Sequence, residues 1–122
     1  MSICVDLCKA SLVSPNGKYE ARLQTDGNFV VYEGATVLWA SNTDGQGTGP
    51  YELRMQTDGN LVLYDSNEIA TWSTDTQGRG SGPYTLVMQD DSNLVIYCNY
   101  DELGTGAPIW SSIYGTESTI RC

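Results

Sequence analysis

The stretch Gln24-Thr-Asp-Gly-Asn-Phe-Val-Val-Tyr32 decides the fold, because the chain repeats it twice more. The second copy is Gln56-Thr-Asp-Gly-Asn-Leu-Val-Leu-Tyr64, and the third is Gln89-Asp-Asp-Ser-Asn-Leu-Val-Ile-Tyr97. All three copies keep Gln, Asp, Asn, Val and Tyr at alternate positions, and they begin 32 and then 33 residues apart. A fixed period of this size predicts a repeat architecture.

Each repeat extends beyond this phrase on both sides. A Tyr lies five residues before each Gln, and a Trp followed by hydroxyl-bearing residues comes after each copy. These aromatic residues are Tyr19, Tyr51, Tyr84, Trp39, Trp72 and Trp110. Apolar and polar residues alternate before the phrase, as in Tyr19-Glu-Ala-Arg-Leu23, which predicts half-buried strands. The Asp-Gly pairs inside the first two copies are typical of hairpin turns.

Short strand signals bounded by Gly, Pro, Asn and Asp occur along the chain, and no stretch has helical periodicity. The sequence therefore predicts an all-β fold whose three equivalent units surround a pseudo-threefold axis. The large rings of the three Trp residues are expected to meet at this axis as part of the core rather than to stack on a ligand. Phe29 and Val31 are expected to face this core, while Asn28, Val30 and Tyr32 face outward.

The length of 122 residues fits a single domain over 1–122, closed by its terminal segments. The internal repeats are expected at roughly 12–43, 44–76 and 77–114. Residues 2–13 are weakly patterned and are expected to form a strand that joins the sheets near the C-terminus. Residues 98–107 lengthen the third unit and are expected to form a surface loop.

The glycine-rich connectors 43–51 and 76–84 lack the features of a phosphate-binding loop and are interpreted as extended turns between sheets.

The composition excludes several classes of function. The net charge of −9, with six Lys and Arg against fifteen Asp and Glu, disfavours nucleic acids and anionic membrane surfaces. No apolar run is long enough to span a bilayer, and residues 1–10 lack the positive start and apolar core of a signal peptide. We therefore expect no nucleic-acid partner and no membrane insertion.

Four cysteines lie toward the ends of the repeat region: Cys4, Cys8, Cys98 and Cys122. The chain has no His, and Cys98 and Cys122 do not have the short paired spacing of a zinc site. We expect disulfides that tie the termini together, with all three pairings open. Reduced, partly buried thiols in a cytosolic protein are the alternative.

The repeated phrase carries chemistry that suits the binding of a sugar. Alternate residues of an extended segment project to one face, so Gln, Asp, Asn and Tyr converge around an apolar Val. Two amides, a carboxylate and a phenol together donate and accept hydrogen bonds, as vicinal hydroxyl groups require. An interpretation of the phrase as turn and strand chemistry alone explains Asp and Gly, but it explains neither Gln nor Tyr in every copy.

Catalysis and metal binding fit the sequence less well. A glycoside hydrolase needs two carboxyl groups about 5–9.5 Å apart, whereas each phrase supplies one Asp at the shared positions. A nucleophile activated by His is impossible in a chain without His. The Asp-x-Asn pattern offers too few oxygen ligands for calcium. We therefore predict no catalytic residue, no metal site and no cofactor.

The phrase Gln-x-Asp-x-Asn-x-Val-x-Tyr, in three copies that are each followed by a Trp, resembles the mannose-binding signature of the bulb-type lectins. This family is also called the monocot or snowdrop-type lectins, and the resemblance covers roughly residues 12–114. It implies a β-prism II fold, in which three four-stranded antiparallel sheets surround a pseudo-threefold axis. It also implies one shallow, metal-independent mannose site on each sheet.

The same resemblance implies a role for each position of the phrase. In the first copy, Asp26 and Asn28 would contact the axial 2-hydroxyl of mannose. Gln24 would bind the 3-hydroxyl, Tyr32 would bind the 4-hydroxyl, and Val30 would pack against ring carbons. The other copies would repeat these roles with Gln56, Asp58, Asn60, Val62, Tyr64, Gln89, Asp91, Asn93, Val95 and Tyr97.

We therefore expect a lectin that recognises α-D-mannose and high-mannose glycans through three sites, in defence, agglutination or adhesion. Its partners would be mannose-containing glycans and glycoproteins, and the chain would form a homodimer or a higher homo-oligomer. A secreted or extracellular location is expected, with a cytoplasmic one as the alternative. The alternative function is a protein-binding module on the same fold with vestigial sugar sites.

Overall fold

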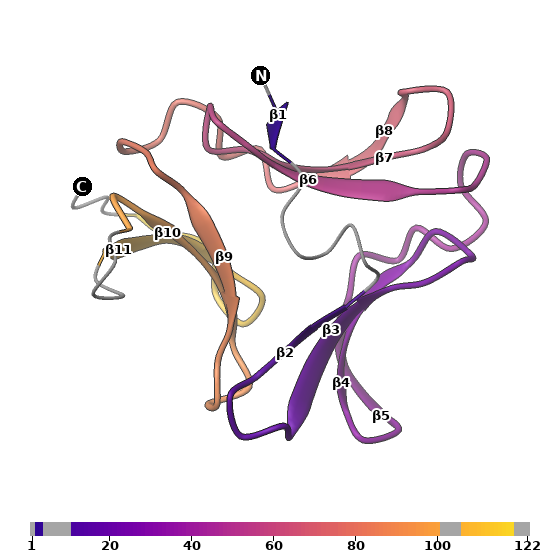
Figure 1. Cartoon of the computed structure of the whole chain (residues 1–122), viewed down its shortest axis with the longest axis horizontal. Coiled ribbons are helices and arrows are strands. Elements are labelled where there is room, and N and C mark those ends of the chain that lie inside the picture. The colour runs from indigo at the N-terminus through magenta and orange to yellow at the C-terminus, as the bar shows by residue number, and fades with distance from the viewer. Residues whose placement is uncertain (1, 4–10, 101–105, 119–122) are drawn as a thin grey trace.

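The computed structural model describes residues 2–3, 11–100 and 106–118. Within these ranges the chain forms twelve β-strands and the turns between them, without a helix. The strands make three antiparallel sheets of four strands each. Figure 1 shows these sheets as the three sides of a prism. This is the β-prism II architecture that the resemblance implies.

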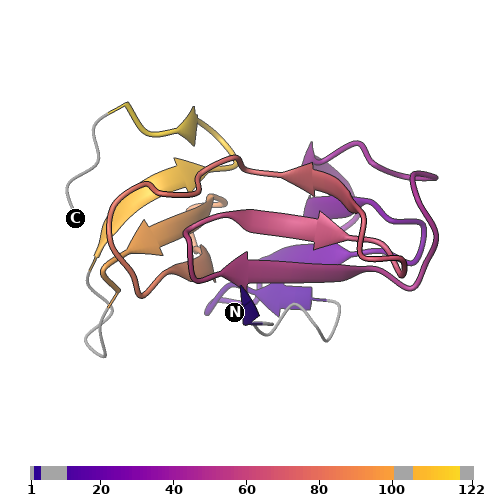
Figure 2. The ribbon, with the colours of Figure 1, turned by 90° about the horizontal axis from the view of Figure 1, so that it is seen from above.

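Each sheet contains three consecutive antiparallel strands from one repeat. The fourth strand lies beside the first of these three in the first and second sheets, and beside the last of them in the third sheet. The first sheet has the order β2 (Ser11–Val13), β3 (Tyr19–Leu23), β4 (Phe29–Glu33) and β5 (Thr36–Ala40). The second sheet has the order β1 (Ser2–Ile3), β6 (Glu52–Gln56), β7 (Leu61–Tyr64) and β8 (Ala70–Ser73). The third sheet has the order β12 (Gly115–Thr116), β11 (Ala107–Ser111), β10 (Leu94–Cys98) and β9 (Thr85–Met88). Figure 2 shows β6, β7 and β8 running side by side in alternating directions.

The N-terminal segment departs from the sequence-based expectation. Residues 2–3 and 11–13 do not belong to one strand beside the C-terminus; they supply strands to the second and the first sheet. β1 pairs with β6, and β2 pairs with β3. The third sheet takes its fourth strand from β12, which pairs with β11. The expectation was wrong because strands of two or three residues have too little alternation to specify a partner.

The two faces of the strands follow the predicted alternation. Tyr19, Ala21 and Leu23 are buried, and Phe29 and Val31 are fully buried, as expected for the core face. Val30 points to the opposite face, yet it is also buried. Its cross-strand partners are Arg22 and Ala40, which flank it on that outer face. Val30 therefore faces outward without being exposed to solvent.

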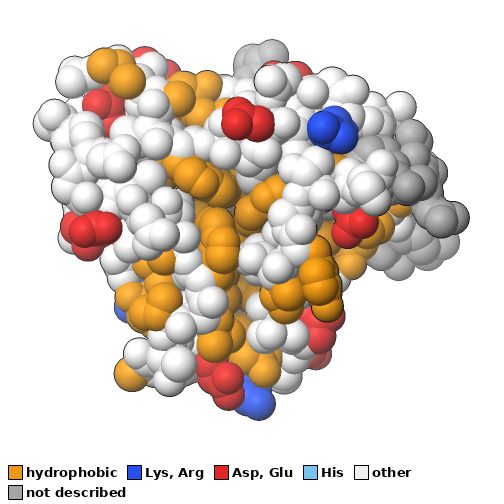
Figure 3. All heavy atoms as spheres, turned by 180° about the vertical axis from the view of Figure 1, so that it is seen from behind, with side chains coloured by type: hydrophobic (Ala, Val, Ile, Leu, Met, Phe, Trp, Pro, Cys, Tyr) orange, Lys and Arg blue, Asp and Glu red, His pale blue; other side chains and the backbone are white. Residues whose placement is uncertain are grey.

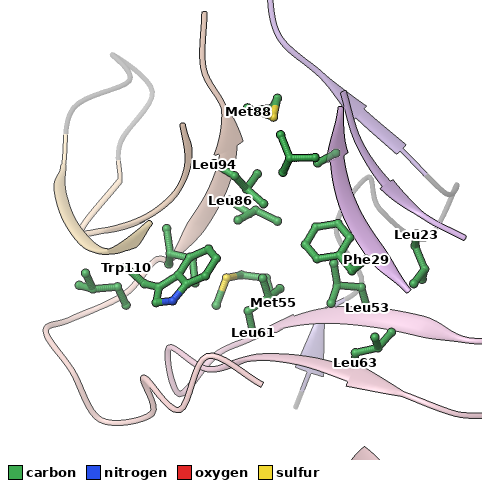
Figure 4. Packing of buried hydrophobic residues seen from close by; sticks show 14 of the residues in the cluster. Leu23, Phe29, Leu53, Met55, Leu61, Leu63, Leu86, Met88, Leu94 and Trp110 are labelled. Atoms are coloured by element: carbon green, nitrogen blue, oxygen red, sulfur yellow. The ribbon is translucent and has the colours of Figure 1, made fainter. Parts of the chain in front are cut away.

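The three Trp rings meet at the centre of the prism, as predicted. The centroid of Trp39 lies 5.6 Å from that of Trp72 and 5.7 Å from that of Trp110, and Trp72 and Trp110 are 6.0 Å apart. All three pairs have edge-to-face geometry, which the ring quadrupole favours. Phe29, Met55 and Leu86, one from each sheet, point into the same interior in Figure 4.

The opposite face of the molecule shows how the sheets join. In Figure 3, apolar side chains run through the middle of this face, between paler ridges of polar side chains and backbone. The core therefore fills the space between the sheets along the prism axis, which leaves the outer faces of the sheets for polar groups.

The glycine-rich connectors form turns between sheets, as predicted. Each contains a cis Gly-Pro peptide bond, at Gly49–Pro50 and at Gly82–Pro83. The Tyr after each Pro returns a hydrogen bond to its own connector: Tyr51 Oη donates to the carbonyl of Gln46 at 2.7 Å. Tyr84 Oη donates to the carbonyl of Arg79 at 2.8 Å. These bonds fix the Tyr ring against the preceding turn.

Only part of the cysteine prediction falls on described residues. Cys98, at the end of β10, is buried and disulfide-bonded. Cys4, Cys8 and Cys122 lie outside the described residues, and the choice among the pairings lies there too. The expected loop at 98–107 is likewise described only at its two ends. In the described part of the chain, no helix is long and apolar enough to cross a membrane.

Candidate functional site

Each repeated phrase forms the hairpin between the first two strands of its repeat, which are β3 and β4, β6 and β7, and β9 and β10. We call these hairpins the first, second and third sites, beginning at Gln24, Gln56 and Gln89. In each site the backbone N–H of the Gln donates to the backbone carbonyl of the Asn, at 2.9, 2.9 and 3.0 Å. The Asp carboxylate accepts from the Asn backbone N–H, at 2.9, 2.9 and 3.0 Å. The hairpin therefore brings Gln, Asp and Asn together, as the sequence predicted.

The residue between Asp and Asn adopts a left-handed backbone conformation in all three sites. Gly27 and Gly59 have φ of 91° and 92°, and Ser92 has φ of 76°. In the first site a Cβ at Gly27 would lie 2.6 Å from the ring of Tyr51, so a glycine is needed there for space as well as for conformation. The third site has Ser92 at this position, in the same left-handed conformation.

The side-chain oxygen of each Asn is held by the segment that follows the Trp of its own repeat. In the first site, Asn28 Oδ1 accepts from Ser41 Oγ at 3.2 Å and from Thr43 N at 3.3 Å. The corresponding donors are Thr74 and Thr76 for Asn60, and Ser112 and Ile113 for Asn93. Because this oxygen is occupied twice, the Asn NH₂ group is left to donate to a ligand.

These hydroxyl residues have no role in the sequence-based prediction of the site. A Ser or Thr lies two residues after every Trp, as Ser41, Thr74 and Ser112, and that regularity is the signal that could have identified them. A further Thr braces two of the turns: Thr43 Oγ1 donates to the Gly27 carbonyl at 2.7 Å, and Thr76 Oγ1 donates to that of Gly59 at 2.6 Å. The third repeat has Tyr114 at this position and therefore lacks this brace.

The Gln and Tyr of each phrase lie in direct contact. Gln24 Nε2 donates to the Tyr32 hydroxyl, and Gln56 Nε2 donates to that of Tyr64 at 2.6 Å. In these two sites the phenol accepts this bond and keeps its own proton for a ligand. In the third site the Gln89 amide lies between two partners. When its oxygen accepts from Tyr97, its nitrogen lies 3.1 and 3.2 Å from the two Asp91 carboxylate oxygens and donates to them.

The Val of each phrase forms the floor of its site. Val30, Val62 and Val95 face outward with the polar groups but are only 1%, 4% and 3% exposed. A side chain covered to this extent offers little area to a sugar ring, so the ring contact that the resemblance implies would be small.

The arrangement presents one amide NH₂ donor, one carboxylate acceptor, one Gln amide and one phenol in each site. Within the described residues, no group of three or more Asp, Glu, Cys or His side chains is arranged to hold a metal ion. The same polar set occurs three times around one axis on similar hairpins. This repetition suits binding of several copies of one small polar ligand.

The sequence also matches a known family over most of its length. The sequence model of the D-mannose binding lectin family matches residues 36–120. The chain belongs to this family. A comparison with curated proteins finds no match.

Solved structures of other lectins resemble this member of the family. A lectin from Marasmius oreades is 36% identical, with a TM-score of 0.68, over 84% of this chain and 78% of that one. A monomeric mannose-binding lectin from Gastrodia elata is 37% identical, with a TM-score of 0.70, over 89% and 88% of the two chains. The snowdrop (Galanthus nivalis) agglutinin, solved with methyl α-D-mannoside, is 35% identical, with a TM-score of 0.63, over 73% and 84%.

The first two sites of this lectin are flanked by ion pairs. Arg54 lies over the Tyr64 ring, 4.4 Å from its centroid, and forms two hydrogen bonds of 2.8 Å to Glu68. These bonds lower the pKa of the Glu68 carboxyl. They also raise the pKa of Arg54 above its ordinary value, with Glu52 adding a smaller effect. In the first site Arg22 lies 5.2 Å from the Tyr32 ring centroid and pairs with Glu20.

Among the described residues, the strand positions that carry Arg and Glu beside the first two sites are uncharged beside the third. Val87 pairs with Val95, which is the position that Arg22 and Arg54 occupy in the other two sheets. Thr85 likewise stands opposite Tyr97, where Glu20 and Glu52 stand opposite Tyr32 and Tyr64. The ring of Tyr100 lies 5.9 Å from that of Tyr97. The three sites therefore share their polar centre and differ at their border.

Proposed function

We propose that the chain is a lectin that binds α-D-mannose and mannose-containing glycans, including high-mannose glycans, through its three sites and without a metal ion. The observation that carries this proposal is the threefold repetition of one hydrogen-bonded cluster. In each cluster, protein contacts occupy one side of the Asn and Asp groups. Their remaining donors and acceptors are available for sugar hydroxyl groups.

Two findings support mannose as the ligand. The family that the chain belongs to is described as D-mannose binding lectins, and its model covers the second and third sites in full. The snowdrop relative was solved in complex with methyl α-D-mannoside. By resemblance, Asp26 and Asn28 would meet the axial 2-hydroxyl of mannose. Glucose carries that hydroxyl equatorially and would leave these groups unpaired, which discriminates against it.

Calorimetric titration with methyl α-D-mannoside in EDTA tests the proposal directly, with methyl α-D-glucoside as the control. A single shallow site is expected to bind with Kd of about 1 mM, or about −4 kcal/mol. Heat from the mannoside alone, with about three sites per chain, is the expected result. If neither sugar produces heat, the proposal fails and the protein-binding alternative takes its place. Binding that disappears in EDTA would refute metal independence.

The proposal is one of binding without catalysis. Each site contributes a single Asp at the shared positions, whereas hydrolysis of a glycoside requires two carboxyl groups with separate roles. Incubation with 4-nitrophenyl α-D-mannoside should therefore release no nitrophenol. Steady release that increases with protein concentration would contradict this part of the proposal.

We also propose that the protein acts in a secreted or extracellular setting, as a homodimer or a higher oligomer. The disulfide-bonded Cys98 supports an oxidising location. Weak sites gain strength when several bind one glycan surface, and avidity can add about 10²–10⁴ to the affinity. This would suit defence, agglutination or adhesion. Light scattering measures the oligomer directly, and a monomer, as in the Gastrodia elata relative, would restrict avidity to the three sites of one chain.

A further inference from the structure

We propose that the third site, unlike the other two, selects a mannose that carries an apolar ring or a second sugar on its 6-hydroxyl. This inference rests on the proposed function and concerns the border of the third site. The residues that carry it are Val87, Tyr97 and Tyr100. No position of the repeated phrase other than Tyr97 contributes to the selectivity.

The third site opens into a depression that is apolar on one side. Pro15, Val87 and Met88 form this side, and the rest of the lining is Gln89, Asp90, Asp91 and Tyr97, so the apolar side is continuous with the polar groups of the site. Pro15 comes from the turn between β2 and β3, and the backbone N–H of its neighbour Asn16 donates to Asp90 at 2.9 Å. This bond holds an element of the first sheet against the third hairpin. A ligand here would therefore contact two sheets.

A pair of aromatic rings extends the same border away from the hairpin. Tyr100 lies beside Tyr97 with a tilt of 46° between the ring planes, and both rings are partly exposed. The backbone N–H of Tyr100 donates to the carbonyl of Pro83 at 3.1 Å, which fixes the start of this segment against the connector before β9. Val87, Tyr97 and Tyr100 thus provide apolar and aromatic area on which the C–H face of another ring could pack.

The first two sites do not offer this area. Arg22 and Arg54 lie over the corresponding Tyr rings and are paired with Glu20 and with Glu52 and Glu68. A ring placed there would cover charged groups and displace their water, which costs free energy. At the third site Thr85 and Val87 replace the Glu and the Arg, so a ring placed beside Tyr97 covers uncharged side chains at these two positions. Selectivity between the sites follows from this difference in desolvation.

The geometry of mannose indicates which substituent would reach this area. If Tyr97 binds the 4-hydroxyl, as the resemblance implies, then carbon 5 and the attached carbon 6 lie next to the phenol. A group on the 6-oxygen would therefore emerge beside Tyr97, toward Tyr100. A group on the anomeric oxygen would emerge on the opposite side of the ring, nearer Asp91. The position of a substituent on the sugar thus becomes a test of the inference.

Site-resolved NMR titration measures each site separately in the intact chain. The backbone amides of Asn28, Asn60 and Asn93 each donate to the Asp of their own site, so each of these signals reports one site. The probes are methyl 6-O-benzyl-α-D-mannoside, methyl α-D-mannoside and phenyl α-D-mannoside. At the third site we expect the 6-O-benzyl probe to bind about three- to tenfold tighter than the methyl glycoside. At the first two sites we expect no such preference.

Two variants of the third site and one matched control test the residues. Tyr100→Ala removes the second ring, and the pair Thr85→Glu with Val87→Arg installs the ion pair of the first site. In both variants, we expect the third site, reported by the Asn93 signal, to bind the 6-O-benzyl probe with about the same affinity as methyl α-D-mannoside. The control pair Glu20→Thr with Arg22→Val opens the first site without supplying a second ring. We expect the first site of this control, reported by Asn28, to prefer the 6-O-benzyl probe less strongly than the third site of the parent chain does.

The outcomes separate this inference from the proposed function. If no mannoside shifts any of the three signals, the proposed function fails and the inference falls with it. If methyl α-D-mannoside binds but the 6-O-benzyl preference is equal at all sites, only the inference is overturned. A preference at Asn93 that survives both third-site variants also overturns it. A preference for phenyl α-D-mannoside alone would place the selective surface on the anomeric side and refute the assignment to Tyr100.

Discussion

The Asn of each site has two functions that a single substitution can separate. Its oxygen holds the segment after the Trp, through Ser41 and Thr43 in the first site, while its NH₂ group is available to a ligand. Replacement by Ala removes both functions and leaves the N–H of Thr43 without an acceptor, which destabilises the hairpin. Replacement by Asp keeps the oxygen acceptor, removes the donor and adds a negative charge beside the Asp of the site.

We therefore predict that the triple variant Asn28→Asp, Asn60→Asp and Asn93→Asp binds methyl α-D-mannoside at least about tenfold more weakly, which corresponds to about 1.4 kcal/mol. Its circular dichroism should match that of the parent chain. The corresponding Ala variant should also lose binding, but with a lower melting temperature. Calorimetry and thermal melts provide both measurements. Parent-like affinity in the Asp variant would show that the Asn NH₂ groups do not contact the sugar.

Ser92 is the position at which the third hairpin departs most from the other two. A residue with a Cβ at φ of 76° is strained, and glycine adopts this conformation without that cost. We predict that Ser92→Gly raises the free energy of unfolding by about 0.5–1 kcal/mol, after the larger unfolded-state entropy of glycine is subtracted. Urea denaturation measures this change.

The reverse substitution is the matched control. Gly27→Ser should destabilise the chain by more than Ser92→Gly stabilises it, because a Cβ there approaches the Tyr51 ring to 2.6 Å in addition to the backbone strain. A destabilised Ser92→Gly variant would mean that the Ser side chain makes a compensating contact. Equal and opposite effects of the two substitutions would mean that the Tyr51 ring moves freely aside.

At the scale of elements, Asp65 joins the turn between β7 and β8 to the connector before β6. Its carboxylate accepts from the backbone N–H groups of Asn67 and Ile69, both at 2.9 Å, and from that of Thr48 at 3.3 Å. The N–H of Ile69 is the strongest of the influences that lower the pKa of this carboxyl. Charge on Asp65 therefore holds two segments of the fold together.

This contact predicts part of the acid sensitivity of the chain. The folded pKa of Asp65 is depressed, so its contribution to stability is complete above the unfolded pKa of about 3.9 and is lost as the pH falls through the folded value. The free energy of unfolding should therefore fall more steeply below about pH 4 in the parent chain than in Asp65→Asn. Urea denaturation at several pH values gives both slopes. Identical slopes would exclude Asp65 as a contributor.

The elements also show where sequence-based prediction succeeds and where it ends. The strands of the repeats were predictable because alternation such as Tyr19, Ala21 and Leu23 has the period of a half-buried strand. The polar cluster was predictable because its members share one short phrase. The brace from Thr43 to Gly27 was not, since these residues lie far apart along the chain and any Thr could make such a bond. The pairing of β1 with β6 was hidden by the shortness of β1.

At the scale of the whole molecule, the three sites depend on one shared centre. Phe29, the neighbour of Asn28 in the sequence, packs against Trp39 of its own sheet and against Trp72 of the second sheet, with centroids 5.8 and 6.2 Å apart. Trp72 in turn contacts Trp110 of the third sheet. The Trp hub therefore connects every sheet to the other two, so we expect a defect in one ring to affect the sites on all three sheets.

We predict that Trp72→Ala lowers the free energy of unfolding by about 3 kcal/mol, because the cavity would remove ring contacts with three aromatic neighbours at once. Trp72→Phe keeps a ring in place and should cost markedly less. Guanidinium denaturation measures the stability of both variants, and the signals of Asn28, Asn60 and Asn93 report mannoside binding at each site. Since the hub is common to the sheets, the Ala variant should weaken all three sites together. Loss confined to the second site would show instead that each sheet holds its own site independently of the shared core.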